Sequence, residues 1–310
     1  MTLEERRILV TGGSGFIGSW IAETLCPTNK VSVFDCFSTG KRKNLAYLKK
    51  DVKITEGDVR EAGKVSHSVK GKDIVFHQAA NVRIPLSVKD PPMDADININ
   101  GTLNVLEACR KHDVGRLVFA SSSAIYGDPV RLPVSEDHPK NPKSPYAVSK
   151  LAGEEYVLNY HRLYGLETVA LRYFNVYGPR QDPSSPYSGV ISIFSKRVSE
   201  GKGITVYGDG KQTRDFVNVR DVVSANILAA EAKKAPGHAI NVGTGESVSL
   251  NRLVGIIEKI SGKKSSIVHE SEREGDVRDS CADITLLRKV LGFKPSIGLE
   301  YGLRELLAKL

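Results

Sequence analysis

A tyrosine and a lysine near the middle of the chain have the spacing of an acid–base pair. Tyr146 and Lys150 open a helical stretch, and residues four apart share one helix face. A free tyrosine has a pKa of about 10, so ionising it near pH 7 requires about 4 kcal/mol. An ammonium about 5 Å away, at an effective dielectric constant of about 20, supplies about 3 kcal/mol. Tyr146 is therefore a candidate general base with Lys150 as its partner, although the same spacing also occurs in ordinary surface pairs.

A run of serines, Ser121 to Ser123, follows an apolar segment that has the pattern of a buried strand. Hydroxyl groups at the carboxyl end of a strand lie where doubly wound sheets bind their ligands. Serine clusters are also common in turns. Because Tyr146 and Lys150 are present as well, we expect the cluster to provide a hydrogen-bonding partner for the hydroxyl group that reacts.

A glycine-rich turn near the N-terminus has the spacing of a dinucleotide-binding turn. Gly12, Gly15 and Gly18 follow the apolar segment 7–11, and an apolar helical stretch comes next. Such glycines permit a tight bend and a close approach of the backbone to a pyrophosphate, while the helix N-terminus offers free N–H groups to the anion. The preceding strand and the following helix raise this motif above a chance Gly-rich loop.

An acidic residue, Asp35, ends the second apolar segment about 20 residues after the glycine turn, where a carboxylate accepts hydrogen bonds from the adenosine ribose. It would repel a 2′-phosphate, so NAD is favoured over NADP. The basic pair Lys41 and Arg42 is a signal in the opposite direction, but it lies beyond a turn. Asp58, after the third strand, is either a helix N-cap or an adenine contact.

The elements that must position these groups alternate in a βαβ rhythm. Strands are predicted at 7–11, 30–35, 52–56, 73–77, 116–121 and 167–173. Continuous apolar runs are typical of buried parallel strands, and six of them predict an α/β fold with a doubly wound parallel (Rossmann) sheet. After about residue 175 the rhythm loosens, which predicts a smaller, mixed α/β C-terminal lobe that ends in an amphipathic helix over 299–310.

The expected organisation is a dinucleotide-binding domain over 1–175, with later segments at about 215–245 interleaved into it. The remainder, 176–310, is expected to form mainly a nucleotide-sugar-binding lobe. The chain of 310 residues with 40% hydrophobic residues is long enough to bury such a core.

Composition narrows the function classes. The chain has a formal net charge of +8, but its basic clusters are short and carry no aromatic-rich motif, so we expect neither a nucleic-acid partner nor a membrane partner. No apolar run reaches about 18 residues, which predicts a cytoplasmic protein. The four cysteines, Cys26, Cys36, Cys109 and Cys281, form no CxxC pair, so we expect reduced structural thiols and no metal site.

The motifs together resemble the extended short-chain dehydrogenase/reductase family, in its UDP-glucose 4-epimerase branch. They occur in the family's order along nearly the whole chain: Thr-Gly-Gly-Ser-Gly-Phe-Ile-Gly at 11–18, Asp35, His-Gln-Ala-Ala at 77–80, Asn-Ile-Asn-Gly-Thr at 98–102, Ser-Ser-Ser-Ala-Ile-Tyr-Gly at 121–127, Tyr-x-x-x-Lys at 146–150, Arg-Tyr-Phe-Asn-Val-Tyr-Gly-Pro-Arg at 172–180, Tyr-Gly-Asp-Gly at 207–210, Thr-Arg-Asp-Phe at 213–216 and Arg-Glu-Gly-Asp at 273–276.

The resemblance implies a role for each matching residue. Tyr146 is the implied base, Lys150 its partner and Ser122 the catalytic hydroxyl. Residues implied to contact NAD are Gly12, Gly15, Phe16, Ile17, Gly18, Asp35, Ser38, Thr39, Gly40, Asp58, Val59, Gln78, Ala79, Ala80, Asn100, Ser121, Tyr146, Lys150, Tyr173 and Val176. Residues implied to contact a UDP-sugar are Arg83, Ser122, Tyr146, Asn175, Gly189, Val190, Tyr207, Arg214, Arg273, Asp276 and Ser280. Arginine suits the diphosphate because its planar fork donates two hydrogen bonds at once.

The sequence departs from the family pattern at three places. Cys36 replaces an asparagine that often follows the ribose-binding aspartate, which puts one cofactor hydrogen bond in doubt. Val82 or Arg83 stands where some epimerases have a lysine near the substrate. The segment from Tyr207 to Arg214 is short, as in the compact epimerases.

The residues after Ser122 discriminate between activities of the family. Related dehydratases and decarboxylases need an acidic residue directly after the catalytic hydroxyl, whereas Ser123 and Ala124 follow here. Epimerisation needs only reversible hydride transfer at C4, so we expect a 4-epimerase that holds NAD tightly and interconverts UDP-glucose and UDP-galactose. The alternatives are a dehydratase, decarboxylase or reductase of nucleotide sugars, or a non-catalytic dinucleotide sensor on the same fold.

Two finer expectations also come from the resemblance. Ser280 aligns with a position where epimerases restricted to glucose and galactose carry a bulky tyrosine, so a small residue here predicts that UDP-N-acetylhexosamines are accepted as well. The alternative is an ordinary loop residue in a pocket narrowed from elsewhere. A homodimer is expected through the helices over 100–111 and 146–163, with Leu103, Leu106, Val148, Leu151 and Leu158 as the apolar surplus.

Overall fold

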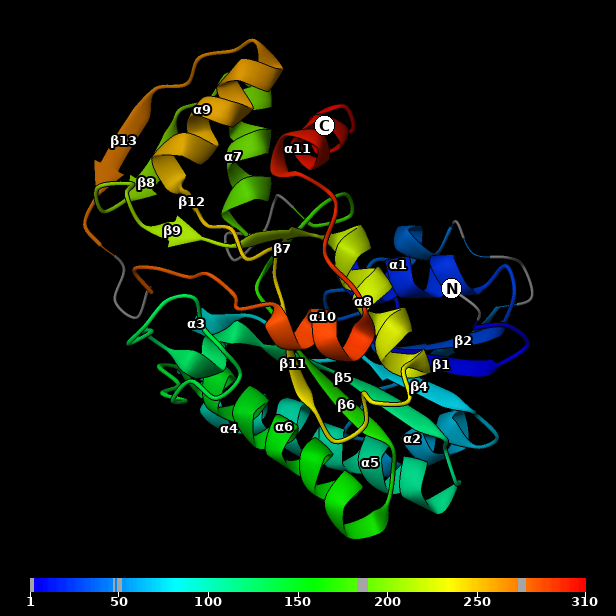
Figure 1. Ribbon diagram of the computed structural model, residues 1–310. Helices are drawn as coiled ribbons and strands as arrows, with labels where there is room; N and C mark the ends of the chain where they lie inside the picture. The colour runs from blue at the N-terminus through cyan, green and yellow to red at the C-terminus, as the bar shows by residue number, and fades with distance from the viewer. Residues whose placement is uncertain (1–2, 47, 49–51, 183–188, 273–276) are drawn as a thin grey trace.

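A seven-stranded parallel sheet forms the centre of the molecule in the computed structural model, which describes residues 3–46, 48, 52–182, 189–272 and 277–310 (Figure 1). Its strand order is β11-β6-β5-β4-β1-β2-β3. The strands are β1 (Arg7–Thr11), β2 (Lys30–Asp35), β3 (Lys53–Glu56), β4 (Ile74–His77), β5 (Arg116–Ser122), β6 (Thr168–Tyr173) and β11 (Ala239–Val242). The doubly wound sheet predicted from the sequence is confirmed.

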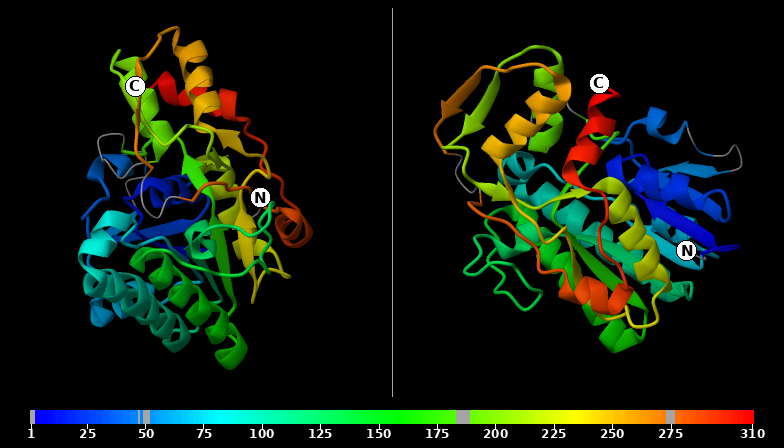
Figure 2. Two further views of the ribbon diagram at one scale, coloured as in Figure 1. Left: turned by 90° about the vertical axis from the view of Figure 1, so that its left-hand side faces the viewer. Right: turned by 45° about the horizontal axis from the view of Figure 1, so that its top comes forward.

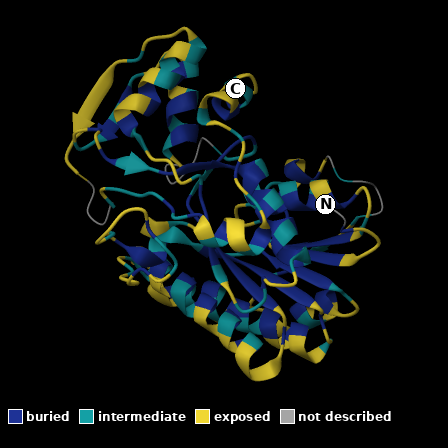
Figure 3. Cartoon of the chain, viewed as in Figure 1, coloured by how far each residue is buried: buried dark blue, intermediate teal, exposed yellow. Residues whose placement is uncertain are grey.

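Helices cover both faces of the sheet and bury two separate apolar clusters (Figures 1 and 3). One face carries α2 (Ala62–Val69), α5 (Gly101–Lys111) and α6 (Pro145–Tyr164); the other carries α1 (Phe16–Leu25), α8 (Val219–Glu231) and α10 (Thr285–Leu291). The central strands are continuously buried, as their apolar runs predict, because helices exclude water from both sides.

The second lobe lies beyond the carboxyl edge of the sheet and has its own apolar cluster (Figure 2). It contains α7 (Val190–Ser199), α9 (Leu250–Ser261), α11 (Leu299–Leu307), and the strands β8 (Ile204–Tyr207), β9 (Thr213–Arg214), β12 (Val248–Ser249) and β13 (Ile267–Glu270). The parallel pair β7 (Asn175–Tyr177) and β10 (Phe216–Asn218) lies between lobe and sheet. The domain boundary at residue 175 stays a prediction.

Short elements carry the chain around the carboxyl edge of the sheet. They are α3 (Ile84–Lys89), α4 (Pro91–Ala95), a π-helical turn η2 (Asp96–Asn100), and the 3-10 turns η1 (Arg42–Leu45) and η3 (Ser123–Tyr126). Because η2 is π-helical, the regular helix starts at Gly101 rather than at the predicted residue 100. The final helix ends at Leu307, three residues before the end of the predicted range, because the last residues form a turn.

The reduced state of the cysteines and the absence of a membrane-spanning segment were both predicted from the sequence. All four cysteines are free; Cys26 and Cys109 are buried, but Cys36 is exposed and donates to Ser38 Oγ at 3.2 Å, so a packing role does not apply to it. Within the described residues, no helix combines the length and the apolar character that crossing a membrane requires.

Candidate active site

Helix α6 carries both the proposed base, Tyr146, and Lys150, and its two ends are well defined. The helix begins sharply because the Ser144 side chain accepts from the backbone N–H of Ala147 at 3.2 Å and Pro145 stands at the first helical position. It ends at Gly165, which has a left-handed φ of +70°. Both Tyr146 and Lys150 therefore lie in the first two turns, on the side that faces the end of β5.

The catalytic groups predicted from the sequence come together at this point. A hydrogen bond with the Ser122 side chain lowers the pKa of Tyr146, but desolvation is the larger effect and raises it overall. Lys150 is only 4% exposed, and its Nζ lies 4.4 Å from the centroid of the Phe119 ring. Burial lowers the pKa of Lys150 to about 8. Ionising Tyr146 near neutral pH consequently requires positive charge beside it, and Lys150 is the cation of this face.

The neutral residue behind the lysine is His77, at the end of β4. Burial, helped by the charge of nearby Lys150, lowers the pKa of His77 to about 3. Its Nδ1 lies 2.7 Å from Thr11 Oγ1 and its Nε2 lies 3.1 Å from Thr102 Oγ1. His77 therefore serves as an uncharged link between β1 and α5 rather than as an acid or base.

The glycine turn packs so closely against neighbouring backbone that Gly12 and Gly18 have no space for side chains, as a dinucleotide-binding turn requires. Gly12 has φ of +65°, and a Cβ at this residue would lie 2.6 Å from the backbone nitrogen of Ala79. A Cβ at Gly18 would lie 2.3 Å from the Gly12 carbonyl oxygen. Helix α1 starts after Gly15 without a side-chain cap, which leaves its first-turn N–H groups available to the predicted pyrophosphate.

The carboxylate of Asp35 is 6% exposed and fixed by two backbone N–H groups: Ser14 donates to Oδ2 and Phe37 donates to Oδ1, both at 2.8 Å. The basic residues that follow have acidic partners of their own. Lys41 pairs with Asp182 at 2.6 Å, and Arg42 pairs with Glu56. Each of the two cations therefore has an acidic partner, which weakens the signal for NADP, and Asp35 stays the residue predicted to bind the ribose.

A polar cluster connects β4, β6 and α8 beside the end of the sheet. The Tyr173 hydroxyl donates to Asn226 Oδ1 at 2.9 Å, and the Gln78 amide lies 3.2 Å from the Tyr173 oxygen. Burial raises the pKa of Tyr173 well above its usual range, so it stays a phenol. Gln78 and Tyr173 are therefore brought together, as the resemblance implies for the cofactor wall.

Three further residues predicted to contact the cofactor have protein partners of their own. Asp58 is not the cap of α2, since Glu61 precedes that helix; the Arg60 guanidinium binds the Asp58 carboxylate at 2.8 Å instead. Val59 has a buried side chain, and its carbonyl accepts from Asn104. Asn100 is exposed and donates to Asp96 at 3.0 Å. Whether any of them touches the cofactor stays a prediction.

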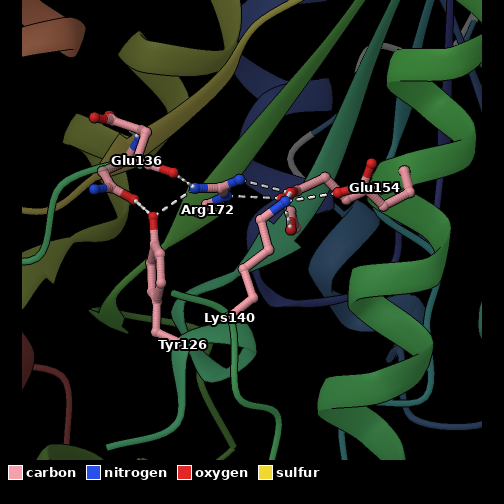
Figure 4. A network of polar contacts seen from close by, with 8 residues as sticks. Tyr126, Glu136, Lys140, Glu154 and Arg172 are labelled. Atoms are coloured by element: carbon pink, nitrogen blue, oxygen red, sulfur yellow. Dashed lines mark hydrogen bonds and ion pairs between the residues drawn. The ribbon is translucent and has the colours of Figure 1, made fainter. Parts of the chain in front are cut away.

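A buried ion pair fixes the strand end that carries Ser122 (Figure 4). Glu154 and Arg172 are 0% and 3% exposed in their side chains and meet through two hydrogen bonds, of 2.7 and 2.9 Å. Ser121 Oγ donates to Glu154 Oε2 at 2.7 Å, and Lys140 Nζ lies 3.7 Å from Glu154 Oε1. The position of β5 against α6 therefore depends on this pair.

The same guanidinium extends the network to the loop after η3 (Figure 4). Arg172 donates to the Tyr126 hydroxyl at 2.6 Å and to the Glu136 carbonyl at 2.9 Å. Tyr126 in turn donates to Asn241 Oδ1 of β11 at 2.7 Å. Burial raises the pKa of Tyr126 to about 12 and also raises that of the Glu136 carboxyl. The network joins three neighbouring strands to the segment that follows Ser122.

The substrate side is organised by Asp215, a fully buried carboxylate between β9 and β10. It accepts from the backbone N–H groups of Thr244 at 2.7 Å, Gly245 at 3.0 Å and Ala282 at 3.0 Å, and burial raises its pKa. The Asp215 carbonyl also accepts from Asn175 N at 3.1 Å. Three loops therefore converge where the diphosphate is predicted to bind.

The structure describes most of the residues predicted to bind the substrate, and they lie in several separate segments. Arg214 donates to the Thr213 carbonyl at 2.8 Å, and Tyr207 ends β8 in a half-buried position. Gly189 and Val190 begin α7, and Arg83 begins α3 with its N–H donating to Asn81 at 3.2 Å. Arg273 and Asp276 lie outside the described residues. Ser280 follows Asp279, which accepts from Thr213 at 2.7 Å.

Sequence reasoning missed one polar cluster behind α6. Asp94, Asn98 and Ser149 are buried together, with Ser149 Oγ donating to Asp94 Oδ2 at 2.6 Å. The available signal was weak: Ser149 lies inside the Tyr-x-x-x-Lys motif and Asn98 opens the Asn-Ile-Asn-Gly-Thr motif, but nothing in the sequence pairs either of them with Asp94.

Comparisons with known proteins agree with this geometry. The chain matches the NAD-dependent epimerase/dehydratase family over residues 8–243. It is 43% identical over 302 residues to a putative UDP-glucose 4-epimerase from Methanocaldococcus jannaschii, covering 96% of both chains. A UDP-glucose 4-epimerase from Mycolicibacterium smegmatis is 39% identical, again covering 96% of both.

Solved structures give the same relationship. A UDP-N-acetylglucosamine 4-epimerase from Methanobrevibacter ruminantium, in complex with UDP-N-acetylmuramic acid, has a TM-score of 0.95 and 40% identity, covering 99% of this chain and 98% of that one. A UDP-glucose 4-epimerase from Thermus thermophilus in complex with NAD has a TM-score of 0.89 and 40% identity, covering 97% and 98%. More distant relatives include a UDP-N-acetyl-alpha-D-glucosaminuronate decarboxylase from Bacillus cytotoxicus at 33% identity, covering 97% of this chain and 96% of the relative.

Proposed function

The chain belongs to the NAD-dependent epimerase/dehydratase family of extended short-chain dehydrogenases/reductases, and from this premise we propose that it is a UDP-hexose 4-epimerase with tightly held NAD. The observation that carries the proposal is that Tyr146 and Lys150, four residues apart on α6, meet Ser122 at the end of β5, where the Ser122 side chain is hydrogen-bonded to Tyr146. The cofactor supplies the acceptor and donor of hydride when it is bound.

The residues of the chain perform the proton transfers in this proposal. Tyr146 Oη removes the proton of the sugar's C4 hydroxyl, while the Ser122 hydroxyl orients the same oxygen. Lys150 stabilises the phenolate by its charge. The 4-keto sugar rotates about its diphosphate link, held there by Arg214 and Asn175, and Tyr146 returns the proton on the other face.

The segment after Ser122 favours epimerisation over elimination and decarboxylation. The Ser122 Oγ accepts from the backbone N–H of Ala124 at 3.2 Å and begins η3, which carries Ser123 and Ala124 in its first turn. Neither side chain is an acid that could protonate an altered sugar. The proposal is tested by incubating the purified protein with UDP-glucose, UDP-galactose and their N-acetyl forms and separating the products. Epimers alone support it, and a 4-keto-6-deoxy product contradicts it.

We further propose that the sugar pocket accepts an acetamido group at C2. Support comes from the small residue Ser280 and from the relative that is named a UDP-N-acetylglucosamine 4-epimerase. Ser280 lies on a segment tied to both neighbouring parts of the site. Arg278 O accepts from Thr213 N at 3.1 Å, and Cys281 O accepts from Val134 N at 2.8 Å. A larger side chain at residue 280 is consequently unable to move away by a shift of this segment.

Ser280→Tyr is expected to reduce turnover of UDP-N-acetylglucosamine at least about tenfold while UDP-glucose turnover survives, because a well-packed pocket rejects a group by about 1–3 kcal/mol. The measurement is kcat/KM for both sugars in wild type and variant. Ser280→Thr, which adds little volume, is the matched control and should keep both activities. The open-pocket idea fails if the wild type converts UDP-glucose well and no N-acetylhexosamine at all.

We also propose a homodimer through α5 and α6, although fewer of the predicted apolar residues are available for the contact than the sequence suggested. Leu106 is fully buried, and Leu103 and Leu151 pack against the core clusters, so these three are no surplus. Exposed apolar side chains nevertheless remain on α6: Val148, Tyr156, Leu163 and Tyr164. Sedimentation at micromolar concentration should give about twice the mass of the 33.8 kDa chain, and a monomer there would refute the dimer. A cytoplasmic location stays a prediction.

A further inference from the structure

A wholly buried carboxylate with only neutral hydrogen-bond partners lies behind the catalytic helix. Asp94, in α4, is 0% exposed. Its Oδ1 accepts from Asn81 Nδ2 at 2.7 Å and from Asn98 Nδ2 at 3.1 Å, and its Oδ2 accepts from Ser149 Oγ at 2.6 Å. No ion pair within the described residues includes Asp94, which sets it apart from the buried Glu154 with its arginine.

Local structure explains how this carboxylate reaches the catalytic helix. Helix α4 is anchored by Asp90, whose side chain accepts from Met93 N at 3.1 Å. The π-helical turn η2 follows and directs the Asn98 side chain inward, where its amide also donates to Ser149 Oγ at 3.0 Å. Ser149 stands between Tyr146 and Lys150 on α6. The cluster therefore contacts helix α6 through the hydroxyl group of Ser149.

Electrostatics explains why a charge is tolerated there. A buried charge is costly unless it is hydrogen-bonded or near an opposite charge. Hydrogen bonds offset part of the cost for Asp94, and the buried ammonium of Lys150 supplies attraction: Asp94 is the largest influence that raises the pKa of Lys150 against burial, followed by Glu154. Glu154, by contrast, already forms an ion pair with Arg172 at 2.7 Å.

We propose that Asp94 is a positioning residue that serves as the buried counter-charge of Lys150, keeping the lysine an ammonium ion while Tyr146 releases and regains its proton. Its kinetic consequence rests on the proposed epimerase function, whereas its effect on the lysine does not. Removing the carboxylate should make Lys150 lose its proton at lower pH. It should also ease the ionisation of Tyr146, because the Asp94 charge opposes a phenolate.

The other charged and titratable groups around Asp94 and Lys150 do not supply the main counter-charge for Lys150. Lys150 faces Tyr146 and Glu154 on its own helix, the neutral His77 on β4, and the Phe119 ring on β5. Besides Tyr146 and Lys150, whose pKa values Asp94 influences, the ionisable residues closest to Asp94 along the chain are Lys89, Asp90 and Asp96. Asp90 and Lys89 are exposed, and the Asp96 side chain is 46% exposed and lies 3.7 Å from Arg60.

Asp94→Asn is the decisive variant because every hydrogen bond has a replacement. The new amide oxygen still accepts from Asn81 and Asn98. The new amide N–H donates to Ser149 Oγ, whose own proton turns to the Tyr146 carbonyl at 3.0 Å. The variant should therefore fold. If its unfolding curve shows otherwise, Asp94→Ser, which leaves room for water, replaces it in the same experiment.

The titration of Lys150 is followed by NMR in the holoenzyme labelled with [13Cε]lysine, with Lys150→Arg identifying the resonance. No sugar is needed, so the result does not depend on which reaction the protein catalyses. We expect the midpoint to fall by about one pH unit in Asp94→Asn, the scale of one nearby opposite charge. Asp96→Asn, the exposed carboxylate two residues along, should leave it unchanged. The same midpoint in Asp94→Asn and wild type overturns the proposal.

The pH dependence of kcat/KM for UDP-galactose gives the second readout. We expect both limbs of the profile to move to lower pH in Asp94→Asn, since the lysine deprotonates and the tyrosine ionises at lower pH. A merely structural role would lower the maximum and leave the limbs in place, and that outcome also counts against the proposal. If no sugar is converted by the wild type, the epimerase proposal fails while the NMR titration still decides the role of Asp94.

Discussion

Tyr146→Phe is expected to lower turnover of UDP-galactose by at least about a thousandfold while NAD stays bound. The phenol is the only part of the side chain that this change removes, and proton transfer by a positioned side chain contributes about 10²–10⁴-fold. Ser122 and Lys150 keep their places, since Lys150 packs over Phe119 at 4.4 Å and does not depend on the tyrosine for support.

The measurement is kcat with saturating substrate, together with the nucleotide released from denatured protein. Tyr301→Phe is the matched control, because Tyr301 is 59% exposed on α11, far from the catalytic helix in sequence, and the same hydroxyl is removed. Near-normal turnover in Tyr146→Phe would eliminate this residue as the base. Loss of both turnover and NAD would mean that the tyrosine is chiefly a cofactor contact.

Arg172→Met is expected to cost about 3 kcal/mol of the free energy of unfolding, because the fully buried Glu154 carboxylate loses its two hydrogen bonds to arginine and keeps as its cation Lys140, whose Nζ lies 3.7 Å from Glu154 Oε1. Ser121 and Tyr126 would also lose part of their shared network, so the end of β5 should loosen. Urea unfolding followed by tryptophan fluorescence gives the value.

Arg110→Met is the control for the loss of an arginine. Arg110 pairs with Glu107 at 2.7 Å, but both side chains are 48% exposed, so we expect a loss below about 1 kcal/mol. The double variant Glu154→Gln with Arg172→Met should recover part of the loss, since no buried charge then remains. An Arg172→Met variant as stable as wild type would show that Glu154 is not held as an anion by this arginine.

The sheet and the catalytic trio could be read from the sequence because their signals are local. Short β-branched runs marked six strands within one residue of their observed ends, and Tyr146 and Lys150 lie four apart on one helix. The seventh strand, β11, was not assigned as a strand. It has only four residues and pairs with β6, some 70 positions earlier in the chain.

The remaining features depend on contacts between distant segments, which no local pattern reports. The opposing signal from Lys41 and Arg42 disappears only when Asp182 and Glu56 are seen beside them. The N-cap alternative for Asp58 was wrong because Arg60 binds the carboxylate instead of the helix end. Asp94 was missed because, of the described partners of its carboxylate, only Asn98 is nearby in the chain, whereas Asn81 and Ser149 lie 13 and 55 residues away.

The hydrogen at C4 of the sugar provides the most direct test of the proposed epimerase. UDP-[4-2H]galactose is incubated with the purified protein, and the products are separated and examined by NMR and mass spectrometry. Because the hydrogen leaves C4 and returns to the opposite face without exchanging with water, UDP-glucose should form with the deuterium still at C4. Deuterium released to water, deuterium found at another carbon of a 4-keto-6-deoxy sugar, or no formation of UDP-glucose would contradict the account.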